Sequence, residues 1–244
     1  MTVKRERTEI ATSNPSLAIV VTDDGSRTLK CLESGVTWHS ESGALAESRL
    51  VFLENSGVAR KFAQHESIRI LEIGFGTGLN FWITASRAMT GSTRLEYVSL
   101  EPNLLDLNVF GELEHRQLGE CQPAFDRFFP LISRPPGSKV AEIVGSHNGV
   151  RLTIHLRTFE PGVFQDLQLF DAVYHDPFGP ESASDLWTTA VFQFLFILLK
   201  PGGKLVTYCV KSEIQRRLKD AGFLVQKTRG PLGGKREVLI ATRV

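Results

Sequence analysis

The sequence has little of what marks several protein classes. Only three cysteines occur among 244 residues, at positions 31, 121 and 209, and this sparse, odd set suits a reducing compartment and shows no metal-like spacing. The net charge is +1, so no overall field attracts a polyanion. The longest apolar run, residues 191–199, is too short to span a bilayer, and the N-terminus lacks the apolar core of a signal peptide. We therefore expect a cytoplasmic protein with no metal and no membrane attachment.

The sequence predicts an α/β protein. Apolar residues make up 42% and charged residues 23%, as in ordinary globular domains. The expected strands are residues 68–73, 94–100, 150–156, 170–175, 203–209, 222–228 and 236–243. The expected helices are residues 77–89, 104–116, 121–132, 185–199 and 211–220. This alternation predicts a parallel sheet covered on both faces, and the last two strands follow each other without a helix, as an antiparallel pair.

The first 60 residues are expected to form an extension on a core of residues 61–244. Residues 17–21 and 27–31 flank an Asp-Gly turn, which predicts a β-hairpin. Residues 41–53 read as a helix. Within the core, the Pro-Pro-Gly-Ser segment 135–138 is the most loop-like point and is interpreted as an insertion.

The most informative segment is residues 68–81, where an apolar strand enters a Gly-x-Gly-x-Gly turn and then a helix. In α/β proteins this arrangement holds a nucleotide-like ligand at the carboxyl edge of the sheet. Glu72 lies beside the turn, where it would repel a pyrophosphate and suit a cationic ligand such as S-adenosylmethionine. Glu101 ends the next strand and is placed to accept hydrogen bonds from ribose hydroxyls.

The strand at 170–175 leads into Asp176-Pro177-Phe178, a shortened form of the acid-or-amide, proline, aromatic motif of amino-group methyltransferases. An ammonium group has no lone pair, so a carboxylate such as Asp176 can accept its proton or orient the neutral amine. Phe178 is placed to stack on a base. His175 points to the opposite face of the strand and is interpreted as a structural residue.

With these motifs, the chain resembles the methyltransferase half of the bacterial bifunctional MnmC-type enzymes, which make 5-methylaminomethyl-2-thiouridine at the tRNA wobble position. The resemblance covers about residues 17–244 and rests on segments 38–53, 73–81, 176–188, 216–223 and 234–237. It implies a class I S-adenosylmethionine-dependent methyltransferase fold, Rossmann-like, with a seven-stranded sheet. Because the chain ends at Val244, it resembles stand-alone members without the flavin oxidase, which depend on other enzymes to install the aminomethyl group.

The resemblance also implies roles for individual residues. Asp176 would contact the substrate aminomethyl group, with Pro177 and Phe178 beside it. Thr158 stands where the family usually has an acid that binds the adenine amino group. The residues expected at the cofactor are Glu72, Gly74, Phe75, Gly76, Gly78, Asn80, Glu101 and Thr158.

The C-terminal segment suggests an RNA partner. Residues 200–244 carry eleven basic and three acidic side chains, and Lys235 and Arg236 follow a glycine pair in the last hairpin. Such a basic face suits phosphate contacts, so both residues are expected to bind tRNA. Three alternatives stay open: a methyltransferase acting on another amine, a nicotinamide-dependent oxidoreductase, and a non-catalytic RNA-binding protein of the same fold.

Overall fold

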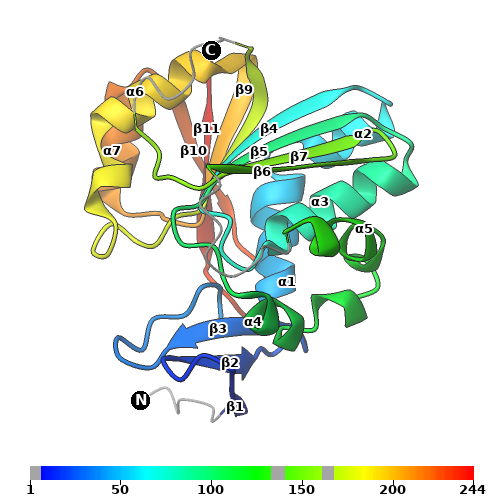
Figure 1. Cartoon of the computed structure of the whole chain (residues 1–244). Coiled ribbons are helices and arrows are strands. Elements are labelled where there is room, and N and C mark those ends of the chain that lie inside the picture. Colours follow the sequence, from blue (N-terminus) through cyan, green and yellow to red (C-terminus); the bar gives the residue numbers. More distant parts are fainter. Residues whose placement is uncertain (1–6, 133–140, 161–167) are drawn as a thin grey trace.

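The computed structural model describes residues 7–132, 141–160 and 168–244. Its central feature is an eight-stranded sheet in the order β10-β11-β9-β8-β4-β5-β7-β6 (Figure 1). The strands are β4 (Ile68–Ile73), β5 (Leu95–Leu100), β6 (Glu142–His147), β7 (Val150–His155), β8 (Phe170–His175), β9 (Leu199–Thr207), β10 (Leu224–Arg229) and β11 (Glu237–Thr242). The five neighbouring strands β9, β8, β4, β5 and β7 run parallel, and the expected β10–β11 hairpin is antiparallel. The fold class is therefore confirmed.

The sheet has one strand more than the seven that we expected. The additional strand, β6, pairs antiparallel with β7. The two are joined by Asn148 and Gly149, both with positive φ, which is the backbone of a tight hairpin turn. The Asn-Gly signal is present in the sequence, but β6 alternates buried and exposed residues at the sheet edge and lacks the continuous apolar run of the central strands.

Helices cover both faces of the sheet. They are α2 (Val58–Ala63), α3 (Leu79–Thr90), α4 (Leu107–Glu112), α5 (Gln122–Ile132), α6 (Thr189–Leu198) and α7 (Ser212–Asp220). Figure 1 shows α3 and α5 on one face and α6 and α7 on the other. One buried cluster, centred on Phe81 and Trp82, lies under α3 and α5, and a second, centred on Trp187 and Phe192, lies under α6 and α7. The two clusters hold the sheet between two helical layers.

The N-terminal part forms a separate three-stranded antiparallel sheet. It contains the expected hairpin, β2 (Leu17–Val21) and β3 (Arg27–Cys31), and an additional short strand, β1 (Glu9–Ala11). The single helix expected at 41–53 is replaced by a short α1 (Ala44–Glu47) that continues into the π-helix η1 (Ser48–Glu54). The division proposed at residue 60 falls within α2 and stays a prediction.

The proposed insertion at 135–138 lies outside the described residues. Across the described ranges, no helix has both the length and the apolar character needed to cross a membrane.

Candidate active site

A cavity of about 700 Å³ opens at the carboxyl ends of the parallel strands. Its walls come from four parts of the chain that are far apart in sequence. The first part is the segment after β3, and the second is the turn after β4. The third comprises the ends of β5 and β7, and the fourth comprises the segments that follow β8 and β9 together with the tip of the last hairpin. This is where open α/β sheets bind ligands.

The glycine turn after β4 forms one wall. Gly74, Gly76 and Gly78 all have positive φ, at 89°, 51° and 72°. A Cβ on Gly74 would lie 2.8 Å from the carbonyl oxygen of Asp176, and a Cβ on Gly76 would lie 3.2 Å from Cδ1 of Trp38. Only glycine fits these positions without strain, and the turn therefore presents bare backbone to the cavity.

Glu101 lies opposite this turn. Its carboxylate accepts hydrogen bonds from the backbone N–H of Gly76 at 3.0 Å and of Asn103 at 2.9 Å. The side chain also lines the cavity, so it links the glycine turn to the end of β5 and leaves acceptor capacity for hydroxyl groups. The bare glycine backbone and this strand-end carboxylate fit the nucleoside part of S-adenosylmethionine.

Glu72 lies directly behind the glycine turn. Its side chain is fully buried behind the turn, where Asn80 Nδ2 donates to it at 3.1 Å and Ser99 Oγ at 2.9 Å. Burial raises the pKa of Glu72 from 4.5 to about 8, while these hydrogen bonds act in the opposite direction. Glu72 is not among the residues that line the cavity, and its role at the cofactor stays a prediction.

Asp176 projects into the cavity from the end of β8. Asn80 Nδ2 donates to its Oδ2 at 2.8 Å, so one amide joins the carboxylates of Asp176 and Glu72. Burial, followed by the negative charges of Glu47 and Glu72, raises the pKa of Asp176 well above its usual range. A carboxyl group with a raised pKa can take up a proton near neutral pH, as a general base requires.

The segment after Asp176 is held by hydrogen bonds to its backbone. Tyr208 Oη donates to the carbonyl of Pro177 at 2.8 Å, and Trp187 Nε1 donates to the carbonyl of Phe178 at 2.8 Å. The Phe178 ring is 40% exposed at the cavity wall and lies edge-on to Trp38, with ring centroids 5.0 Å apart. Phe178 and Trp38 therefore form an aromatic rim that can stack on a planar ligand.

Lys235 lines the cavity, and its side chain is also partly exposed to solvent. Its Nζ lies 3.3 Å from Oε1 of Glu47 and 3.7 Å from the centroid of the Tyr208 ring. Arg236, its neighbour, is exposed and lies outside the cavity wall. The two residues that we expected to act together on RNA thus point to different surroundings.

The structure brings together most of the predicted site residues. Those that line the cavity are Gly74, Gly76, Glu101, Thr158, Asp176, Pro177, Phe178 and Lys235. Glu72, Phe75, Gly78 and Asn80 lie behind the wall, and Phe75 packs among Phe81, Trp82 and Phe110. The roles assigned to these residues stay predictions.

His175 belongs to the core. Its ring is fully buried and lies edge-on to Trp187, with centroids 4.6 Å apart, and to Phe192. Burial lowers the pKa of His175 to about 3, so the ring is neutral at physiological pH. This environment agrees with the interpretation of His175 as a structural residue.

The cavity residues that were not predicted from the sequence include Trp38, Glu47 and Tyr208. Trp38 and Glu47 lie in the segment 38–53, whose resemblance to the family was noted without a role for either residue. Tyr208 follows the carboxyl end of β9, and the position of that strand in the parallel sheet could have indicated it.

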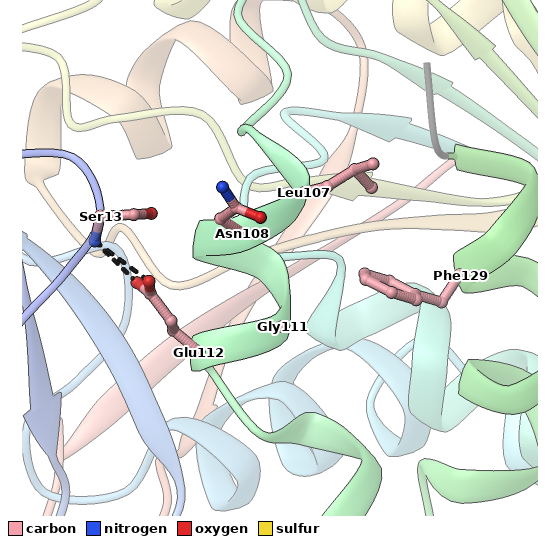
Figure 2. Close-up of a pocket in the computed structure, with 6 residues that line it drawn as sticks. All are labelled: Ser13, Leu107, Asn108, Gly111, Glu112 and Phe129. Atoms are coloured by element: carbon pink, nitrogen blue, oxygen red, sulfur yellow. Dashed lines mark hydrogen bonds between the residues drawn. The ribbon is translucent and has the colours of Figure 1, made fainter. Parts of the chain in front are cut away.

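A second hollow, of about 590 Å³, lies on the outside of the molecule between the N-terminal sheet and α4 (Figure 2). Its lining residues are Ser13, Leu107, Asn108, Gly111, Glu112 and Phe129. The carboxylate of Glu112 accepts hydrogen bonds from the backbone N–H of Ser13, as Figure 2 shows. Because the carboxylate of Glu112 already accepts these hydrogen bonds, this hollow is a weaker candidate for an active site than the first cavity. Neither cavity holds a cluster of His, Cys, Asp or Glu able to bind a metal, and the same is true of all residues that the structure describes.

Known proteins with similar sequences agree with the interpretation of this cavity as a site for S-adenosylmethionine. Residues 131–244 match a family described as S-adenosyl-L-methionine-dependent methyltransferase. A bifunctional tRNA 5-methylaminomethyl-2-thiouridine biosynthesis protein, MnmC, from Ralstonia nicotianae is 32% identical over 84% of this chain and 31% of its own length. The MnmC protein of Thiobacillus denitrificans is 30% identical over 85% of this chain and 34% of its own length. The chain thus spans about a third of the length of these relatives.

A solved structure extends the similarity to nearly the whole chain. MnmC2 from Aquifex aeolicus is 25% identical and superimposes with a TM-score of 0.70, covering 98% of this chain and 71% of that one. The match takes in the sheet, both helical layers and the N-terminal sheet. The glycine turn, the acid at the end of β5 and the terminal antiparallel hairpin of this chain lie within the matched region. The family match, the MnmC relatives and this structure together show that the chain has the fold of the S-adenosyl-L-methionine-dependent methyltransferases.

Proposed function

We propose that the protein transfers a methyl group from S-adenosylmethionine to the primary amine of 5-aminomethyluridine, with or without 2-thiolation, at the wobble position of tRNA. The product would be the 5-methylaminomethyl nucleoside. The observation that carries this proposal is the position of Asp176, whose carboxylate enters the cavity beside the cofactor turn. The MnmC relatives, named for biosynthesis of this same nucleoside, support the choice of substrate.

The residues of the chain suit this reaction. When bound, S-adenosylmethionine supplies an activated methyl group, so the enzyme mainly positions the amine in line with it. Asp176 can accept the ammonium proton, which frees the nitrogen lone pair for attack. The hydrogen bond from Asn80 fixes the orientation of the Asp176 carboxylate. Phe178 and Trp38 would stack on the uracil ring once it is turned out of the anticodon loop.

The charged residues of the last hairpin favour an RNA partner. Arg229 and Arg236 flank its tip, where the N–H of Gly230 donates to the carbonyl of Arg236 at 2.9 Å. Both arginine side chains are exposed, and neither forms an ion pair within the described part of the chain. By contrast, Lys227 is paired with Glu237 and Lys235 with Glu47. We therefore assign the phosphate contacts to the two arginines.

The test is a methyl-transfer assay with two tRNAs that differ only at the wobble uridine, one carrying the aminomethyl group and the other unmodified. We expect methyl incorporation into the aminomethyl tRNA alone, identified by mass spectrometry of the nucleosides. The variant Asp176→Asn should lose transfer by roughly 10²- to 10⁴-fold, the usual contribution of a general base. It should still bind S-adenosylmethionine. Transfer to neither tRNA, together with methylation of a free primary amine, would indicate a small-molecule substrate.

A further inference from the structure

A cation already lies in the cavity, between a carboxylate and an aromatic ring. The ammonium of Lys235 is 3.3 Å from Oε1 of Glu47 and 3.7 Å from the centroid of the Tyr208 ring. Glu47 comes from α1, Tyr208 from the end of β9 and Lys235 from the last hairpin. A carboxylate next to the face of an aromatic ring is a favourable environment for an ammonium group.

Glu47 has one carboxylate oxygen that receives no hydrogen bond from the protein, although the ammonium of Lys235 lies 3.3 Å from it. Its side chain is only 4% exposed, and its Oε2 accepts a hydrogen bond from the backbone N–H of Ser40 at 2.7 Å. Its Oε1 is buried without a hydrogen-bond partner, although the side chain lines the cavity. A buried carboxylate oxygen without a hydrogen bond is costly, and a ligand N–H would remove that cost.

The surrounding carboxyl groups also favour a ligand cation in the place of the Lys235 ammonium. Two carboxyl groups, those of Glu47 and Asp176, line the cavity, and the charge of Glu47 acts on Asp176. Against them stands the ammonium of Lys235, whose side chain is 41% exposed and long enough to move away. A ligand that brings its own ammonium group would replace Lys235 without leaving these acids uncompensated.

Resting on the proposed function, we infer that Glu47 and the ring of Tyr208 form the subsite that receives the ammonium group of the aminomethyl substrate. Lys235 occupies this subsite until the substrate enters, and so acts as an internal competitor. This assignment differs from the expectation that Lys235 binds RNA phosphate, and the two roles predict opposite effects when the lysine charge is removed.

The test uses two anticodon stem-loop RNAs that are identical except for 5-aminomethyluridine or uridine at the wobble position. Binding of each is measured by fluorescence anisotropy at saturating S-adenosylhomocysteine, which prevents turnover. The informative quantity is the affinity ratio of the aminomethyl RNA to the unmodified RNA. Glu47→Gln should lower this ratio by about tenfold, the lower range for a hydrogen bond to a charged group. Lys235→Met should raise it by about two- to fivefold, because the competing cation–π contact is gone.

Arg236→Ala is the matched control, because it removes a neighbouring charge outside the cavity. It should weaken the binding of both RNAs equally and leave the affinity ratio unchanged. If Glu47→Gln no longer binds S-adenosylhomocysteine, the variants Tyr208→Leu and Tyr208→Phe are tested in its place. Tyr208→Leu should then lower the affinity ratio, and Tyr208→Phe, which keeps the aromatic ring, should leave it unchanged. The inference would be overturned if Glu47→Gln left the affinity ratio unchanged, or if Lys235→Met weakened the binding of both RNAs equally. Either result would leave the proposed function in place. A parent protein that does not distinguish the RNAs would overturn both.

Discussion

The buried carboxyl group of Glu72 should make the stability of the protein depend on pH. Its side chain is fully buried and its pKa is raised from 4.5 to about 8, with burial as the main cause. Between these two values the folded state therefore binds a proton that the unfolded chain has released. As a result, the free energy of unfolding should fall as the pH rises from about 5 to 8.

The size of this effect follows from the same two values. One pKa unit corresponds to roughly 1.36 kcal/mol, so a rise from 4.5 to about 8 sets an upper limit of about 5 kcal/mol on the loss. Glu72→Gln removes the titration and keeps the shape of the protonated carboxyl group. Its amide can still accept from Asn80 Nδ2, and the hydroxyl of Ser99 can rotate to accept from the new NH₂ group.

The measurement is urea denaturation of the parent and of Glu72→Gln at several pH values between 5 and 9, without cofactor. The two proteins should be of similar stability at pH 5, and the variant should be the more stable at pH 9 by several kcal/mol. Glu66→Gln, which removes an exposed carboxylate, is the control and should follow the parent. Parallel pH profiles for the parent and Glu72→Gln would refute the argument, because they would mean that Glu72 is ionised in the folded protein at no cost.

Three further predictions follow from the site and the core. Gly76→Ala should weaken S-adenosylmethionine binding by about tenfold in calorimetric titration, because a φ of 51° and a Cβ 3.2 Å from Trp38 would displace the turn. The rate of methyl transfer should rise between pH 6 and 9, because the deprotonated fractions of the substrate amine and of Asp176, whose pKa is raised, both increase with pH. A single-turnover rate that does not change with pH would contradict this. Asp171→Asn should lower the free energy of unfolding at pH 7 by about 2 kcal/mol, measured with urea, because two lysine ammoniums then lose the buried carboxylate that they contact.

Much of the fold could be predicted because the central strands are buried on both faces. β4 and β8 occupy the residues that we expected, 68–73 and 170–175, because most of their side chains are apolar and buried. The edge strand β6 was missed because half of its side chains face solvent and so interrupt the apolar pattern. The helix expected at 41–53 was wrong in type, since widening to a π-helix depends on packing that no local pattern reports.

The candidate site was predictable where local sequence determines the backbone. The glycine turn and Asp176 each end a central parallel strand, so their meeting at one edge follows from the topology. The ion pair of Glu47 with Lys235 joins residues 188 positions apart, and no local sequence pattern at either residue predicts it. The burial of Glu72 depends likewise on side chains from α3 and β5 that close over it.

The close approach of Gly74 to Asp176 has a consequence for how this enzyme can change. A single added methyl group at position 74 would meet the carbonyl oxygen of Asp176 at 2.8 Å. In the proposed function, the wall between the methyl donor and Asp176 is therefore one backbone thick. Substitutions that reshape the turn for a different donor will also move the carboxylate, so donor and acceptor specificity cannot be adjusted independently at this point. Redesign for new amines should instead begin on the opposite wall, at Trp38 and Tyr208, where side chains rather than backbone form the contact.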